Sequence, residues 1–130
     1  MKKKVCLLWI SFLLGMTTMM AQEIPAGLTN AFSKGNAQEL SPYLSETVEV
    51  ILQNEKQIYN QQEVKQTMSD FFSANKVNDF KVSHQGKRNE SSFIIGMLYT
   101  SKGAYRINCF FKKNKQQYLI NQIRIDKTNE

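Results

Sequence analysis

The first hydrophobic residues after position 23 repeat at the spacing of a helix. In residues 24–35 they fall at i, i+4, i+7 and i+8, which places them on one face, and Gly35 can end the helix. Residues 36–44 start with Asn36 and carry Glu39 three positions later, which is typical of a helix N-terminus. We therefore expect two short consecutive helices that pack as an antiparallel pair.

The hydrophobic residues recur at every second position in residues 46–53, where Val48, Val50 and Leu52 alternate with other side chains. This alternation predicts a strand with one buried face, and the QIY sequence after the next turn is compatible with a short returning strand. Helical spacing returns after Asn60, which again has a glutamate three residues later. The sequence therefore predicts an amphipathic helix. Its apolar face is formed by Val64, Met68, Phe71 and Phe72.

Four strand-like stretches separated by short turns make up the rest of the chain. They cover residues 77–86, 91–100, 104–111 and 117–126. Short turns make consecutive strands antiparallel neighbours, so these stretches predict a meander. The helices must cover the apolar face of this sheet, which gives an α+β fold with the order ααβ(β)αββββ. A mostly antiparallel sheet that curls around the helices leaves a cone with a cavity at its mouth.

The beginning of the chain has the layout of a secretory signal peptide. Three lysines precede an uncharged apolar run, and Ala21 supplies a small residue for cleavage. The apolar run is shorter than the ~20 residues that a membrane-spanning helix needs. We therefore expect residues 1–21 to be a signal peptide and residues 22–130 to form a single domain.

Cleavage would leave no stable membrane anchor, and the protein would be exported to the periplasm or to the outside of the cell. An uncleaved N-terminal anchor is the alternative. A lipoprotein is not favoured, because Cys6 stands at the start of the apolar run and not at its end.

Removal of the signal peptide also changes the net charge. The full chain has 17 Lys and Arg residues against 11 Asp and Glu, a net charge of +6, and three of the lysines lie among its first four residues. Without those three lysines the net charge falls to +3, which is too little to indicate a nucleic-acid partner. The KKNK run at residues 112–115 is expected to be a solvated hairpin tip.

Cysteine and histidine are scarce in the expected mature chain. Cys109 is its one cysteine, so no internal disulfide can form, and His84 is its one histidine. Metal sites in proteins need several such ligands, so we expect no metal, and no other cofactor is indicated. We expect Cys109 to be a buried small hydrophobic residue.

The order of the elements, together with the stretches GNAQELSPYLS and YRINCFFKK, resembles the nuclear transport factor 2-like, cystatin-like α+β superfamily. Within it, the chain is similar to a group of small secreted domains of unknown function from Bacteroidetes-type bacteria. The resemblance implies that the helix at residues 60–74 packs into the concave face of a curved sheet. It assigns no activity, because fold alone does not determine function.

Enzymes of this superfamily, such as ketosteroid isomerases and polyketide cyclases, resemble one another in having acids in the cavity. In this sequence no Asp or Glu falls on the inner face of a late strand, so we expect no catalytic residues of that kind. The residues expected to face inward and to line a pocket are Phe72, Phe80, His84, Tyr99, Tyr105 and Cys109.

These features favour an exported, non-enzymatic binding domain. Its partner would be a small apolar ligand or a protein, bound at the cavity mouth or on the open sheet face. One alternative is a small cyclase or isomerase that uses His84 with a tyrosine such as Tyr99 or Tyr105. The other alternative is a purely structural homodimer, in which Phe110 and Tyr118 take part if they lie on the convex face.

Overall fold

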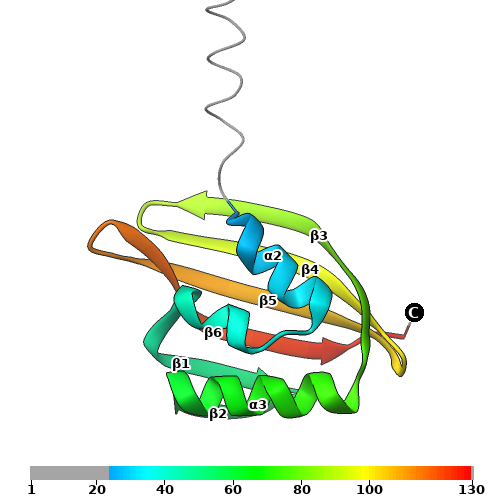
Figure 1. Cartoon of the computed structure of the whole chain (residues 1–130). Coiled ribbons are helices and arrows are strands. Elements are labelled where there is room, and N and C mark those ends of the chain that lie inside the picture. Colours follow the sequence, from blue (N-terminus) through cyan, green and yellow to red (C-terminus); the bar gives the residue numbers. More distant parts are fainter. Residues whose placement is uncertain (1–23, 130) are drawn as a thin grey trace, which may run out of the picture.

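The computed structural model describes residues 24–129, and the signal peptide expected at residues 1–21 lies outside them. Helices cover one face of a single sheet, and the opposite face of the sheet carries no helix from this part of the chain (Figure 1). None of the described helices is long and apolar enough to cross a membrane.

The helices are α2 (Ala26–Lys34), the 3₁₀ helix η1 (Gln38–Tyr43) and α3 (Gln61–Ala74). Gly35 ends α2 in the left-handed region, with a φ of 63°, as the sequence predicts. The second predicted helix is present as η1. Its Pro42 lacks the N–H that a regular helix would use, which is consistent with a short 3₁₀ segment.

The capping box predicted at Asn60 is formed, and at η1, whose N-cap is Ala37, the preceding Asn36 makes the expected hydrogen bonds. The side chain of Asn36 accepts hydrogen bonds from the backbone N–H groups of Gln38 and Glu39, at 3.0 and 3.3 Å. At the start of α3, the Asn60 side chain accepts from the Glu63 N–H, and the Glu63 carboxylate accepts from the Asn60 N–H, both at 2.9 Å. These bonds satisfy backbone donors that have no partner within the helix.

The sheet has six strands in the spatial order β2-β1-β6-β5-β4-β3. All neighbouring strands are antiparallel except β1 and β6, which are parallel. The returning strand after β1 is present as β2. The strand bounds are β1 (Leu44–Leu52), β2 (Glu55–Asn60), β3 (Val77–Arg88), β4 (Ser91–Thr100), β5 (Gly103–Asn114) and β6 (Gln117–Lys127).

The predicted α+β fold and its element order are confirmed, and the sheet is not closed into a barrel. The helices divide the sheet between them: α3 packs against β1 and β2, and α2 packs against β3 (Figure 1). At the end of α3, the ring of Phe71 also reaches Tyr105 of β5, with centroids 5.0 Å apart. The meander is therefore covered mainly by α2, and α3 extends the covered face toward the β2 edge.

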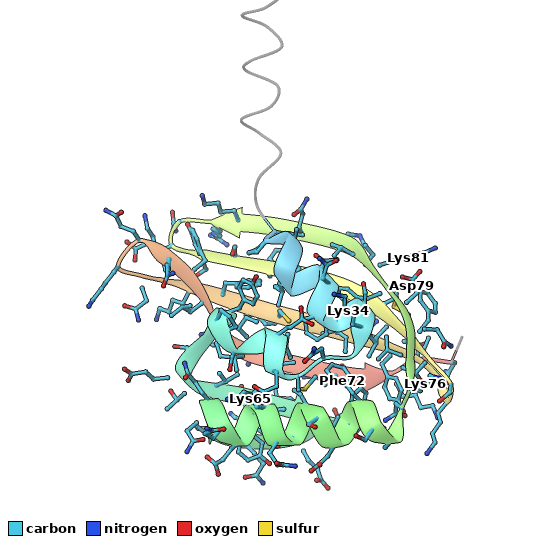
Figure 2. The ribbon with its side chains drawn as sticks, viewed as in Figure 1. Lys34, Lys65, Phe72, Lys76, Asp79 and Lys81 are labelled. Atoms are coloured by element: carbon cyan, nitrogen blue, oxygen red, sulfur yellow. The ribbon has the colours of Figure 1, made fainter. Side chains whose placement is uncertain are left out.

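The core lies between the helices and the inner face of the sheet. An aromatic cluster joins α2, α3 and β3: the ring centroids of Phe32 and Phe80 are 4.9 Å apart, and those of Phe32 and Phe72 are 6.4 Å apart. Figure 2 shows Phe72 on the side of α3 that faces α2. Burial of these rings supplies much of the hydrophobic stabilisation that ties the two helices to the sheet.

Candidate functional site

A pocket opens at the end of the sheet where the β3–β4 and β5–β6 hairpins lie, on the left in Figure 1. Its volume is about 340 Å³. The beginning of the described chain and the end of η1 form one side, and residues of β3, β4, β5 and β6 form the other. The pocket exists because α2 starts and η1 ends before they reach the tips of the hairpins.

The walls of the pocket are mostly apolar. Ile94 and Phe111 form its buried sheet side, and Leu119 is half-buried near the start of β6. Ile24 and Pro42 close it from the helical side. A ligand that enters would remove apolar surface from water on both sides, which is the main source of affinity in such sites.

A few polar groups are placed among the apolar ones. Gln85, Ser92 and Gln117 line the pocket. No side-chain hydrogen bond of these three residues is present within residues 24–129, so their amide and hydroxyl groups are free to bind a ligand or water. The described lining residues include no Asp, Glu or His, so they offer no carboxylate or imidazole for proton transfer.

Gly86 belongs to the pocket lining, and Phe93 fills the space that its missing side chain leaves on the outer face of the sheet. A Cβ at this position would collide with the ring of Phe93, its cross-strand neighbour on β4. The missing side chain therefore lets the Phe93 ring lie directly over the β3 backbone. The same ring also packs near Phe110 of β5, with centroids 6.3 Å apart.

The six residues expected to line a pocket lie elsewhere. None of them belongs to the lining of the described pockets. Phe72, Phe80, Tyr105 and Cys109 are buried in the core, and His84 and Tyr99 are exposed. The structure thus gathers the first four into the packing between helices and sheet, while the other two lie on the outer face.

The inward-facing prediction for His84 is wrong, and a β-bulge explains why. Val82 pairs with Gly96, but His84 pairs with Ile95, so one residue of β3 is left over between them. One extra residue reverses the alternation of side chains along the rest of the strand. His84 therefore points to the outer face, where its Nδ1 lies 3.3 Å from the hydroxyl of Ser83.

Tyr99 also lies on the outer face, contrary to prediction. Its neighbour Leu98 pairs with Tyr105, and both are buried, so Tyr99 must point to the opposite side of β4. His84 pairs with Ile95, four residues from Tyr99, which separates the two side chains by roughly 13 Å along β4. The structure does not bring this histidine and this tyrosine together.

Tyr105 has a structural partner in the core. Its hydroxyl donates a 2.9 Å hydrogen bond to the side-chain oxygen of Asn75, the residue that follows α3. The amide nitrogen of Asn75 donates in turn to the carbonyl oxygen of Phe71, also at 2.9 Å. This buried chain of bonds satisfies polar groups at the end of α3 and fastens the helix to β5.

Cys109 is fully buried among hydrophobic residues on the inner face of β5. Burial removes the thiolate from water and raises the pKa of the thiol to about 12. The thiol is thus neutral near physiological pH, and it serves as a small hydrophobic side chain, as expected. Within residues 24–129, no group of three or more His, Cys, Asp or Glu residues could hold a metal ion.

A second hollow, with a volume of about 420 Å³, lies between the turn after α2 and the outer side of α3. Its lining is polar and includes Lys34 and Lys65, which Figure 2 shows on α2 and α3. It has no apolar wall that could exclude water from a ligand. The apolar pocket at the hairpin end is therefore the better candidate for a binding site.

Tyr118 is a pocket residue that the sequence pattern did not assign. It lies opposite Lys113 in the β5–β6 pairing, on the same side of the sheet as Phe111. It is thus not on the convex face, whereas Phe110 is, with 37% of its surface exposed. The signal that could have pointed to Tyr118 is its place beside a hairpin tip, which none of the helices described in residues 24–129 covers.

Comparison with known proteins places the chain within a family and a wider fold. No curated protein matches the sequence. A crystal structure of a DUF4783 family protein from Bacteroides ovatus is 52% identical, with a TM-score of 0.82; the match covers 85% of this chain and 100% of that one.

Two more distant structures are similar in fold alone. One is a domain of unknown function with a cystatin-like fold from Nostoc punctiforme, 13% identical at a TM-score of 0.64, covering 80% of this chain and 72% of that one. The other, Rd1NTF2_04 with long sheet, is 10% identical at a TM-score of 0.64, covering 76% of this chain and 92% of that one.

The model of one family matches residues 26–126, which is nearly all of the described structure. This match, the identity with the Bacteroides ovatus protein and the shared α+β fold agree with one another. The chain belongs to the family described as domain of unknown function (DUF4783), and its fold is nuclear transport factor 2-like and cystatin-like.

Proposed function

We propose that this protein is an exported, non-enzymatic domain that binds a small apolar ligand in the pocket at the hairpin end of the sheet. The observation that carries the proposal is the pocket itself, with a volume of about 340 Å³ and mostly apolar walls. Small-molecule sites usually measure ~300–1,000 Å³ and combine such walls with a few polar groups. Gln85, Ser92 and Gln117 provide those groups here.

The positions of the titratable residues support binding over catalysis. A cyclase or isomerase of the type considered above needs a base and an electrophile that face one substrate. His84 and Tyr99 are far apart on the outer face, and the Tyr105 hydroxyl is occupied by Asn75. The pocket contains none of the three. The export part of the proposal rests on the lysines and the apolar run at the start of the sequence.

The proposal is tested with the neutral fluorescent probe N-phenyl-1-naphthylamine. Saturable binding is expected, with enhanced emission because the probe leaves water. The variant Gln85→Trp places a large ring on the pocket face of β3, since Gln85 pairs with the buried Ile94. We expect this ring to fill the pocket and to weaken probe binding at least tenfold, which corresponds to about 1.4 kcal/mol.

Gln57→Trp is the matched control, because Gln57 is an exposed strand residue on β2 and lies outside the pocket. Its thermal unfolding and its affinity for the probe should match those of the unmodified protein. Absence of saturable binding, or equal affinity in the Gln85→Trp variant with its fold intact, would show that this pocket does not bind apolar ligands.

The open sheet face favours a second candidate, self-association of the domain. Apolar side chains follow one another along the outer side of β4 and continue onto β5. They are half-buried or exposed, and no described helix covers them. Such a face is commonly used for contact with a protein. The residues are Phe93, Ile95, Met97, Tyr99 and Phe110.

A further inference from the structure

We infer that the ligand of the apolar pocket is an amphiphile with an anionic head group, and that the head lies at the pocket rim beside Lys87 and Lys113. This inference rests on the proposed function and narrows its ligand to a chemical class. It follows from the position of cationic side chains around a pocket whose described lining contains no carboxylate.

Lys87 is held at the edge of the pocket by a residue of its lining. The Nζ atom of Lys87 lies 5.2 Å from the centroid of the Tyr118 ring, a distance typical of a cation–π contact. Lys87 pairs with Ser92, which pairs with Phe111, and both of these residues line the pocket. Since directly opposed residues project on the same face, Lys87 leaves β3 on the pocket side.

Lys113 comes from the other hairpin and reaches the same side. It is the cross-strand partner of Tyr118, so its side chain leaves β5 on the face that carries the Tyr118 ring. The two lysines thus stand on different strands and share one lining residue as a neighbour. An anionic group above the ring of Tyr118 would lie between two ammonium groups.

The rest of the rim reinforces this charge. The strand ends and turns at residues 85–92 and 111–119 carry five cationic residues and one acidic residue, Glu90. The described chain has two ion pairs, Lys56 with Glu49 and Arg124 with Asp126, and neither involves this end of the sheet. The five rim cations are therefore not neutralised by a salt bridge within residues 24–129. They are Lys87, Arg88, Lys112, Lys113 and Lys115. Arg88 and Lys112 both pair with Ser91, so they leave the sheet on the opposite face and contribute only to the field at this end.

The geometry suits a molecule with two unlike ends. The apolar walls favour a hydrocarbon body, and the volume of about 340 Å³ lies within the ~300–1,000 Å³ usual for small-molecule sites. The free amide of Gln85 and the ammonium groups of the rim can donate hydrogen bonds to an oxyanion. A field of unpaired cations also attracts anions from solution before they enter.

The test compares decanoate with 1-decanol, which has the same chain length and no charge. Both are titrated by displacement of N-phenyl-1-naphthylamine from the unmodified protein and from the double variant Lys87→Gln/Lys113→Gln. Lys81→Gln/Lys102→Gln removes the same charge from exposed positions outside the pocket and is the matched control.

We expect decanoate to bind more tightly than decanol to the unmodified protein. The rim variant should weaken decanoate about three- to tenfold and leave decanol unchanged, because exposed charge pairs contribute modestly. The control variant should change neither affinity by as much as twofold, and added salt should weaken decanoate alone.

Equal affinities for decanoate and decanol, both unaffected by the rim variant, would overturn the anionic head group and leave the apolar pocket standing. If no probe binds, the proposed function itself fails. If the probe binds but neither compound displaces it and no vesicles are bound, the anionic amphiphile is overturned. Sedimentation with phosphatidylglycerol vesicles distinguishes the source of the head group. If the unmodified protein binds these vesicles but not free decanoate, and the rim variant does not bind the vesicles, then the anionic head group belongs to a membrane lipid.

Discussion

At the scale of single residues, the hydrogen-bond partners of polar side chains reveal which side chains hold the fold and which are free for a ligand. Tyr105 is bound to Asn75 inside the core, whereas Gln85 at the pocket has no side-chain partner within the described chain. The polar atoms of Tyr105 and Asn75 are satisfied within the protein, whereas the amide of Gln85 must be satisfied by water or by a ligand. A residue type such as tyrosine does not by itself tell the two roles apart.

The role of Tyr105 gives a testable prediction. Tyr105→Phe removes the hydroxyl and leaves the side-chain oxygen of the buried Asn75 without a donor. The free energy of unfolding should fall by about 1–3 kcal/mol, measured by urea denaturation. Tyr99→Phe is the control, because Tyr99 is 37% exposed, and it should leave stability almost unchanged. A Tyr105→Phe variant as stable as the original protein would contradict the role of this bond.

At the scale of secondary-structure elements, regular spacing predicted what each element buries. The helices around Phe32 and Phe72 and the alternating strands could be recognised because each has one continuous apolar face. The position of His84 could not be recognised from the sequence. A bulge of one residue reverses the two faces of β3 and leaves no trace in the spacing of the apolar residues. The side-by-side position of β1 and β6 was equally hidden, since no short turn connects these two strands.

The pocket itself could not be predicted from sequence for a related reason. It forms where elements end and fail to meet, so its lining comes from positions such as Ile24, Pro42 and Tyr118 that share no periodic pattern. Periodicity identifies surfaces that are covered. A gap in that cover becomes visible only when the lengths of all the elements and their mutual positions are known.

The close contact between β3 and β4 gives a prediction at the scale of these strands. Gly86→Ala would force the Phe93 ring away from the β3 backbone, because the added Cβ collides with it. Overpacking of this kind typically costs about 1–3 kcal/mol, so the midpoint of thermal unfolding should fall and affinity for N-phenyl-1-naphthylamine should change. Ser91→Ala on exposed β4 surface is the control and should have neither effect. An unchanged Gly86→Ala variant would mean that the ring relocates at no cost.

At the scale of the whole molecule, the two faces of the sheet have different roles. The inner face forms the core under the helices, while the outer face exposes 37% of Tyr99 and 37% of Phe110. Ile58 on the edge strand β2 is 68% exposed, but it stands apart from that group in the strand order. The apolar area is therefore concentrated over β4 and β5, which is where a second copy of the domain would pack.

Self-association through this face is tested by light scattering coupled to size exclusion. If the domain forms a dimer, the measured mass should be about twice that of one chain. A stable contact of this kind buries ~800 Å² per partner. Phe110→Lys should then yield a monomer, because a charge buried without a partner is costly. Ile58→Lys, a change of the same kind on the edge strand, should leave the mass unchanged. A monomeric original protein would exclude a homodimer at the concentrations used.

The place of β6 in the sheet determines when the molecule can fold. This last strand lies between β5 and β1, and its parallel pairing joins residues as far apart in sequence as Leu44 and Ile120. Without β6, the β1–β2 hairpin has no neighbouring strand in this sheet to pair with, and distant contacts of this type are slow to form. The six-stranded sheet can therefore be completed only once β6 is present, although β6 follows the five other strands in the sequence.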